Sequence, residues 1–294
     1  MLNDMEKDIK DLVQISQEIG QFQDFVQGGG GNTSVKLDDN LMVIKASGFF
    51  LKQMTEDDGF AIVKYDKIRE YIQTNNSLEV SEEELSKSIN NSMQEIEGFP
   101  KLRPSIETGF HAILPEKFVV HTHSVYANIL CCSKEGRDIA KTLFPKSLWV
   151  PYANPGKEIT FKINLLAKGE KIIFMQNHGI IVSGETMKEV IENHRFVNEK
   201  IIEFFEIEKE YNIKNLKVDM NFLKQNVIFP DQVVYLLSQE LQHTIAGVET
   251  LNAFQFIISN VKKIGLTLNL ISQKDVNYIE NMESEKYRKS LIKQ

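Results

Sequence analysis

The sequence predicts a fold of interleaved strands and helices, in the α/β or mixed α+β class. Short apolar runs of strand length occupy residues 41–44, 118–121 and 172–175. Between them lie longer segments whose apolar residues recur every three or four positions, which is the period of a helix. The chain has 294 residues, 42% of them hydrophobic, so it can form one large domain or two small ones.

The N-terminal elements are predicted to be a helix and a strand pair. Apolar side chains three and four positions apart indicate an amphipathic helix over residues 9–22. These side chains are Leu12, Ile15, Ile19 and Phe22. A glycine loop at residues 28–31 follows, and expected strands at residues 32–37 and 41–44 flank a turn at residues 38–40.

The rest of the chain continues this alternation and becomes less regular toward its end. Ser81 followed by Glu84 is a capping-box pattern, which predicts a polar helix reaching about residue 93. The next expected elements are strand 60–65, helix 105–114, strand 118–121, helices 125–132, 137–143 and 158–167, strands 172–175 and 180–182, and helix 185–208. After residue 216 the expected features are the start of a new element at 229–231, an apolar run at 233–237 and a helix at 283–292.

Charge and cysteine content exclude several classes of protein. The 34 Lys and Arg against 41 Asp and Glu give a formal charge of -7, which argues against a nucleic-acid partner or an anionic membrane. No apolar run approaches the roughly 20 residues of a membrane helix, and the N-terminus lacks the order of a signal peptide. We therefore expect a cytoplasmic protein. Cys131 and Cys132 are adjacent, so a disulfide scaffold is not expected.

Three histidines form a candidate metal site. His121 and His123 end an apolar strand, and side chains two apart on a strand leave the same face, so both imidazoles can reach one ion. His178 lies between two strand-like runs, where a loop can present a side chain at a sheet end. Three histidines are a zinc-type set. The alternative is two buried histidines satisfied by backbone, with His178 turned to solvent.

Glu107 is the carboxylate expected to join these histidines. It lies near the start of the helix that leads into the histidine strand, where it can be a fourth ligand or a proton acceptor. The alternative is a surface glutamate favoured by the helix dipole. His111, four residues on, is interpreted as a core or supporting residue. No chemistry is expected of His194 or His243.

The glycine loop is a candidate anion site. It is not a dinucleotide fingerprint, because no strand precedes it and no helix follows. Backbone amides of this loop and of Gly48, with the Asn32 amide and the Ser47 hydroxyl, can hold a phosphate or carboxylate, and Lys45 would add positive charge. A purely structural turn is the alternative.

Six sequence blocks occur in one order that resembles the class II aldolase/adducin family. They are Gly29–Lys36, Lys45–Gly48, Arg103–Glu107, His121–His123, Pro151–Tyr152 with Pro155–Gly156, and Asn177–Gly179. Residues 229–231 and 285–288 also resemble the tail of longer members, the aldolase half of rhamnulose-phosphate aldolase/dehydrogenase fusions. No block of this chain resembles the dehydrogenase half.

The resemblance implies an α/β/α sandwich with a central, mostly antiparallel sheet over residues 1–215. Residues 216–294 would form a C-terminal extension packed on it. It also implies a homotetramer and a divalent metal, commonly Zn²⁺, with Mn²⁺ or Co²⁺ as alternatives. The implied metal ligands are His121, His123, His178 and Glu107, the last also acting as general acid/base. The implied substrate-phosphate residues are Gly31, Asn32, Lys45, Ser47, Gly48 and Ser105.

The activity implied by the resemblance is aldol cleavage of a ketose 1-phosphate. The products would be dihydroxyacetone phosphate and an aldehyde, formed through a metal-stabilised enediolate, with Glu107 moving the proton. Same-fold epimerases, dehydratases and decarboxylases are alternatives, as are a zinc hydrolase and an adducin-like interaction module without catalysis. The interaction module predicts loss of the metal ligands, which this chain retains.

Two positions depart from the family pattern. Ile106 stands where the short aldolases carry a second hydroxyl just before the glutamate, which weakens the case for phosphate. The family's subunit-crossing catalytic tyrosine has no match, although Tyr126 and Tyr152 lie nearby in the sequence.

Overall fold

The computed structural model describes residues 2–99, 101–208, 219–238 and 240–292. Its strands are β1 (Asn32–Lys36), β2 (Leu41–Lys45), β3 (Phe60–Lys64), β4 (Phe118–Thr122), β5 (Leu148–Val150), β6 (Ile172–Met175) and β7 (Gly179–Gly184). They form one sheet in the order β3-β2-β1-β4-β7-β6-β5. Every neighbouring pair is antiparallel except β5 with β6, which is parallel. The predicted mostly antiparallel sheet is confirmed.

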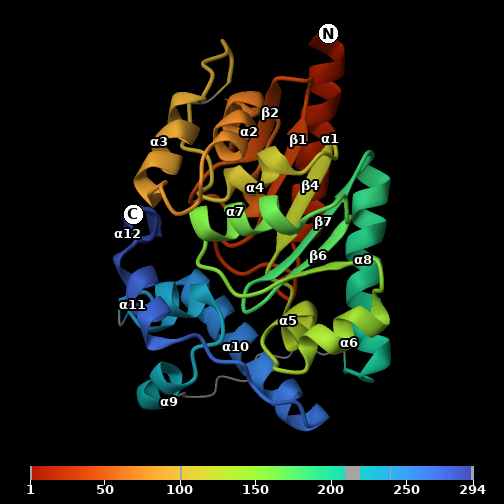
Figure 1. Cartoon of the computed structure of the whole chain (residues 1–294), viewed down its shortest axis with the longest axis vertical. Coiled ribbons are helices and arrows are strands. Elements are labelled where there is room, and N and C mark those ends of the chain that lie inside the picture. The colour runs from red at the N-terminus through yellow and green to blue at the C-terminus, as the bar shows by residue number, and fades with distance from the viewer. Residues whose placement is uncertain (1, 100, 209–218, 239, 293–294) are drawn as a thin grey trace.

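Helices cover both faces of this sheet (Figure 1). Up to β7 they are α1 (Leu2–Gly20), η1 (Leu51–Gln53), α2 (Tyr65–Thr74), α3 (Glu82–Asn91), α4 (Thr108–Ile113), α5 (Val125–Cys131), α6 (Gly136–Leu143) and α7 (Lys157–Leu166). After β7 they are α8 (Met187–Phe204), α9 (Met220–Gln225), η2 (Gln232–Leu236), α10 (Ile245–Ile264), α11 (Gln273–Asn281) and α12 (Glu283–Ile292). α1 and α8 pack on one face, against β1 and β7, and α2 and α7 pack on the other, against β2 and β5. The predicted α/β/α sandwich is therefore confirmed.

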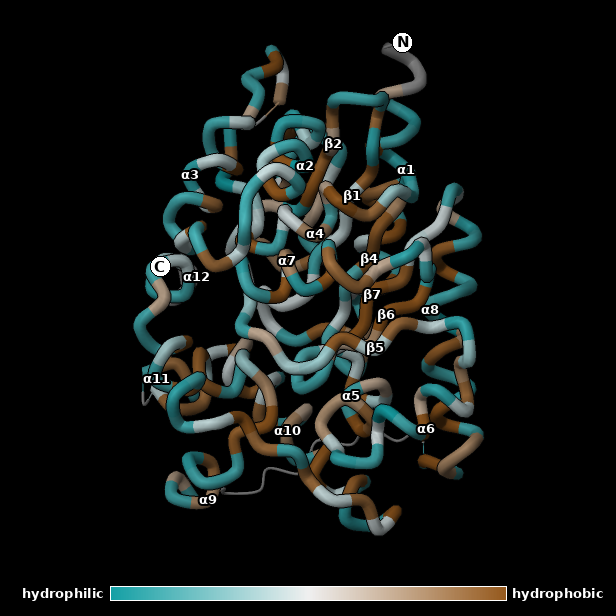
Figure 2. The backbone as a smooth tube through the Cα atoms, viewed as in Figure 1, coloured by the Kyte–Doolittle hydropathy of each residue, from teal (hydrophilic) through white to brown (hydrophobic). Residues whose placement is uncertain are grey.

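Burial of both sheet faces explains why β2 and β6 are nearly continuous apolar runs in the sequence. Successive side chains of a strand point to opposite faces. In β4, Val120 joins the core beneath α1, α5 and α8, whereas Val119 joins the core beneath α4 and α7. Figure 2 shows the hydrophobic residues concentrated along the central strands, with hydrophilic residues on the outer turns of the helices.

The described C-terminal residues share an apolar core with the first part of the chain. Phe229, Tyr235 and Phe254 belong to the same buried cluster as Leu12 of α1 and Ile129 of α5. α10 lies against α5 (Figure 1). The expected boundary at residue 215 lies outside the described residues, so the division into residues 1–215 and 216–294 stays a prediction.

Several elements lie where the sequence pattern indicated none. These are η1, α2, β5, α9, α10 and α11. Glu107 precedes α4 as its N-cap residue, because this helix begins at Thr108 instead of residue 105. The capping box that predicted α3 is present, since Glu84 N donates to Ser81 Oγ and Ser81 N donates to Glu84 Oε2. Among the described helices, none has the length and apolar character needed to cross a membrane.

Candidate metal centre

The sheet topology brings the three histidines to one end of two adjacent strands. His121 lies in β4 and His123 directly follows it, while His178 lies in the turn between β6 and β7. β4 and β7 pair with Thr122 opposite Ile180, so the turn reaches the end of β4. Asn177 in this turn has φ of 56°, a left-handed conformation that asparagine tolerates better than most residues.

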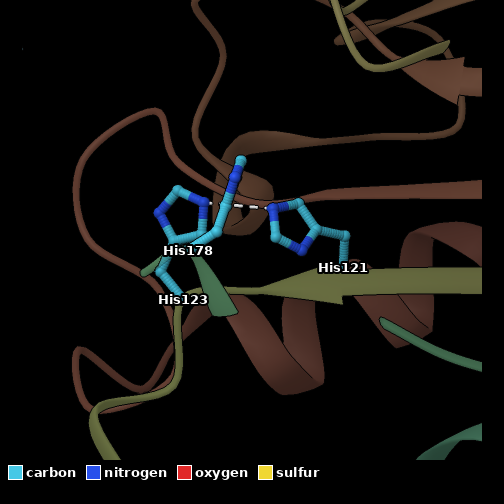
Figure 3. Close-up of side chains that lie close together, drawn as sticks. All are labelled: His121, His123 and His178. Carbon is cyan, nitrogen blue, oxygen red and sulfur yellow. Dashed lines mark hydrogen bonds between the residues drawn. The ribbon is translucent and has the colours of Figure 1, made fainter. Parts of the chain in front are cut away.

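The three imidazole rings converge on one point (Figure 3). The Nε2 atoms of His121 and His123 lie 3.1 Å apart, and one ligand atom from each of the three rings lies within 4.8 Å of the others. Two nitrogens bound to one tetrahedral Zn²⁺ at about 2.0–2.1 Å would be separated by roughly 3.3 Å. The spacing of His121 and His123 therefore suits ligands of one ion.

The hydrogen-bonding partners of these rings also suit a cation. His121 Nδ1 lies 2.9 Å from the carbonyl oxygen of Ile180, which can only accept, so Nδ1 carries the proton and Nε2 a lone pair. Burial lowers the pKa of His121 to about 3, so the ring is neutral. His123 Nδ1 lies 2.9 Å from a carboxylate oxygen of Asp231, whose negative charge favours a proton on Nδ1 and a lone pair on Nε2. With both Nε2 atoms unprotonated, the two rings would hold a cation through these lone pairs.

Glu107 completes this arrangement from the N-cap of α4. Its Oε1 lies 3.0 Å from His178 Nε2 and its Oε2 lies 3.6 Å from His121 Nε2. Burial alone would raise the pKa of the Glu107 carboxyl, but the contact of this carboxylate with His178 outweighs burial and holds the pKa well below its usual range. Glu107 is therefore an ionised, buried carboxylate aimed at the histidine cluster. The alternative of a surface glutamate is wrong, since Glu107 is 6% exposed.

Asn32 and His111 hold Glu107 from behind. Asn32 Nδ2 donates to Glu107 Oε2 at 2.7 Å and to Ser105 Oγ at 3.2 Å. The other end of the Asn32 amide contacts His111 Nε2, and His111 Nδ1 lies 2.7 Å from Ser34 Oγ. His111 thus supports Asn32 and has no ring atom in the metal cluster. In this structure Asn32 positions Glu107, and its assignment to phosphate binding stays a prediction.

One pocket joins the metal cluster to the expected phosphate residues. His123, His178 and Glu107 line this pocket. All six expected phosphate residues line it as well: Gly31, Asn32, Lys45, Ser47, Gly48 and Ser105. Lys45 Nζ donates to the carbonyl oxygens of Gly29 and Phe49, so its charge is fixed at the glycine loop. Arg103 and Ile106 line the same pocket.

Four C-terminal residues also line this pocket, and sequence reasoning did not assign them to the site. They are Pro230, Asp231, Ser284 and Glu285. Pro230 and Asp231 belong to the block at residues 229–231 and Glu285 to the block at residues 285–288, but the chemical role of these blocks could not be inferred without their spatial neighbours. The C-terminal residues thus form part of the wall of the candidate active site.

The two tyrosines considered for the missing catalytic position make hydrogen bonds away from the pocket. Tyr126 Oη donates to Asp24 Oδ2 at 3.0 Å, and Tyr152 Oη donates to Asn154 Oδ1 at 3.1 Å. Neither is among the described residues that line the pocket. His194 is buried in α8, with Nε2 3.0 Å from Thr122 Oγ1. The sequence stretch around it is polar, but its ring faces the protein interior.

Comparison with known proteins identifies the fold. The family model described as the class II aldolase and adducin N-terminal domain matches residues 10–201. The chain belongs to this family. The match contains the three histidines, Glu107 and every expected phosphate residue, and it ends before the C-terminal part of the pocket wall. The three-histidine cluster within the matched region is compatible with a divalent-metal site.

The similar proteins carry names that record different activities. The chain is 30% identical over 218 residues to the "Uncharacterized oxidoreductase YuxG" of Bacillus subtilis, covering 66% of this chain and 30% of that protein. It therefore spans less than a third of that relative. It is 25% identical over 201 residues to the 3-oxo-tetronate 4-phosphate decarboxylase of Haemophilus influenzae, covering 63% of this chain and 80% of that protein. The N-terminal class II aldolase domain of a conserved Thermoplasma acidophilum protein superposes with a TM-score of 0.58 and 27% identity, covering 67% and 93% of the two chains.

Proposed function

We propose that this chain is a divalent-metal-dependent lyase that cleaves a carbon–carbon bond in a sugar phosphate. The first candidate reaction is retro-aldol cleavage of a ketose 1-phosphate to dihydroxyacetone phosphate and an aldehyde. One observation carries the proposal: the buried Glu107 carboxylate faces two of three convergent imidazoles at the floor of a pocket.

His121, His123 and His178 would hold the ion, the first two through Nε2, with Glu107 as a further ligand or as the base beside it. Three imidazoles favour zinc, with Mn²⁺ and Co²⁺ as the alternatives. When bound, a divalent cation polarises a carbonyl and stabilises the negative charge that develops on its oxygen as the adjacent bond breaks.

Glu107 is the residue that we propose moves the proton. Its carboxylate is ionised, as its lowered pKa requires, and the hydrogen bond from Asn32 fixes one of its oxygens. A carboxylate in this state can take a proton from substrate carbon in the addition direction and return it in the cleavage direction. Burial of Glu107 and His121 limits the access of bulk water to the reacting atoms.

Other residues of the same pocket are proposed to bind the substrate phosphate. The hydroxyls of Ser47 and Ser105 and the loop at Gly48 are part of its lining, and Lys45 and Arg103 supply positive charge there. Because the whole chain carries a net charge of -7, attraction of an anionic substrate has to come from such local groups.

A decarboxylase acting on a sugar-acid phosphate is the second candidate. It is favoured by the relative named 3-oxo-tetronate 4-phosphate decarboxylase, of which the matched region covers 80%. Both reactions leave negative charge next to a carbonyl, so both fit the same set of histidines and Glu107. They differ in the product released: an aldehyde in one case and carbon dioxide in the other.

Assembly and location complete the proposal. From the family resemblance we propose a homotetramer in the cytoplasm. Size-exclusion chromatography with light scattering measures the assembly directly, with a tetrameric mass expected and a monomeric mass contradicting it.

A product assay distinguishes the two reactions. Zinc-loaded protein is incubated with a panel of ketose 1-phosphates and 3-oxo acid phosphates, and dihydroxyacetone phosphate and carbon dioxide are measured separately. Release of either product by the wild type and its loss in Glu107→Gln support the proposal. Bound zinc with no release of either product from any panel member contradicts it and moves the assignment to an epimerase or dehydratase.

A further inference from the structure

Asp231 lies behind His123, on the side of the ring away from the other histidines. Its Oδ2 is 2.9 Å from His123 Nδ1, while His123 Nε2 is 3.1 Å from His121 Nε2. The Asp231 carboxylate is 4% exposed. It belongs to the segment after residue 219, beyond the part of the chain that the family model matches.

The backbone around Asp231 is held by the same turn that presents His178. Asn177 Nδ2 donates to the carbonyl oxygens of Ile228 and Asn269, at 2.8 and 2.7 Å. Ile228 N donates to Gln232 Oε1 at 3.0 Å. The position of the carboxylate is therefore tied to the position of a second histidine of the cluster.

Gly30 packs directly against the contact between Asp231 and His123. A Cβ atom at Gly30 would lie 2.7 Å from His123 Nδ1 and 2.8 Å from Asp231 Oδ2. The backbone of the glycine loop thus closes over this pair, which leaves no room for a side chain there. The loop, the ring and the carboxylate form one packed unit.

We propose that Asp231 is a positioning residue of the metal centre. Its carboxylate keeps the proton of His123 on Nδ1, so the Nε2 lone pair faces the ion, and its negative charge makes that nitrogen a better ligand. Asp231 cannot itself join the ligand cluster from behind the ring, and it is absent from the group of side chains that could hold one ion among the described residues. The inference rests on the proposed metal centre and is independent of which reaction the enzyme catalyses.

Zinc affinity of the full chain tests this role. Chelator-stripped wild type, Asp231→Asn and Glu249→Gln are titrated with Zn²⁺ against a chromophoric chelator. Glu249 is the matched control, because it is another buried C-terminal carboxylate that holds the glycine loop, accepting from Gly28 N at 2.6 Å without contacting a histidine. Asp231→Asn is expected to bind zinc about 10–100-fold more weakly, and Glu249→Gln within about threefold of wild type.

Nitrogen-15 NMR of the histidine rings supplies a readout that loss of packing alone would not give. In zinc-loaded wild type, His123 is expected to carry its proton on Nδ1 and to bind zinc through Nε2. The inference is overturned if His123 binds zinc through Nδ1, if Asp231→Asn keeps wild-type affinity, or if both variants lose affinity equally. Because the wild-type spectrum needs no variant, it decides the question even if Asp231→Asn fails to fold. Tight zinc binding without any lyase activity would remove the proposed function and leave this inference standing.

Discussion

Asn32 of β1, which pairs with His121 of β4, donates a hydrogen bond to Glu107 at a distance of 2.7 Å. A residue of the glycine-rich segment therefore fixes the carboxylate beside the proposed metal ligand His121, its own strand neighbour. This relationship joins the first part of the chain to the proposed metal centre through one sheet pairing. It brings together two motifs whose hydrogen-bonded residues are 75 positions apart in the sequence.

Replacing Glu107 by glutamine should separate catalysis from metal binding. The amide keeps the shape of the side chain but cannot accept the substrate proton, so turnover should fall by roughly 10²–10⁴-fold. Zinc should remain bound, since three imidazoles are unchanged. Steady-state kinetics and metal analysis of the same preparation check this, and a Glu107→Gln enzyme with wild-type turnover would refute the assignment.

Removing a proposed ligand should lower metal content. His178→Ala takes away one of the three convergent imidazoles, so zinc should be lost on dialysis under conditions in which the wild type retains it. His243→Ala is the matched control, because His243 is exposed and outside the cluster. Elemental analysis gives the comparison directly. Equal zinc in both variants would show that His178 is not a ligand.

The glycine loop should tolerate alanine at one position and not at the next. A Cβ at Gly30 would meet the His123 ring, the Asp231 carboxylate and the Gln27 backbone oxygen at 2.7–2.9 Å, whereas at Gly29 the nearest atom is 3.7 Å away. Because the backbone oxygen cannot easily move, Gly30→Ala should displace His123. We expect at least tenfold weaker zinc binding for Gly30→Ala than for Gly29→Ala, by chelator competition. Equal affinities would contradict this packing.

Buried His194 should make the chain less stable in acid. Burial lowers its pKa to about 3, against about 6.5 in an unfolded chain. Between these values the unfolded state binds the additional proton, so the free energy of unfolding falls as pH falls from about 6.5 toward 3. At pH 5 the contribution of His194 to this loss is about 2 kcal/mol.

Urea unfolding of chelator-treated protein at pH 7 and pH 5 measures the effect. His194→Gln should lose less stability than the wild type over this interval, because the titrating group is gone. His121 and His111 have lowered pKa values from burial as well, so part of the acid sensitivity should persist in the variant. An unchanged pH dependence in His194→Gln would contradict the buried, neutral state of this ring.

Sequence patterns predicted the elements whose signals are local. The apolar run 172–175 coincides with β6, and the capping box at Ser81 marks the start of α3. α2 was missed because it continues directly from β3 with Lys64, which makes no side-chain cap. β5 was missed because three residues are too short for a recognisable period. The caps of α10, Thr244 and Gly265, were signals that could have been used.

The candidate site likewise contains residues that local sequence signals predicted and residues that depend on tertiary packing. The pairing of His121 with His123 follows from the two-residue period of a strand. His178 was a candidate from its place between two strand-like runs and Glu107 from its place near the start of the helix that leads into the histidine strand, and the family resemblance implied both as ligands. Asp231 could not be predicted, because its contact with His123 spans 108 residues and depends on how the C-terminal segment packs. The roles of Ser284 and Glu285 in the pocket wall depend on the same packing.

The central claim is that product release by this chain depends on an ion held by its three histidines. The most direct measurement titrates Zn²⁺ into chelator-stripped protein and follows release of dihydroxyacetone phosphate or carbon dioxide from the reactive member of the substrate panel. The account predicts no release by stripped protein and full restoration at one zinc ion per chain, with no restoration in His121→Ala. Full turnover by stripped protein, or restoration in His121→Ala at the same zinc concentration, would contradict it.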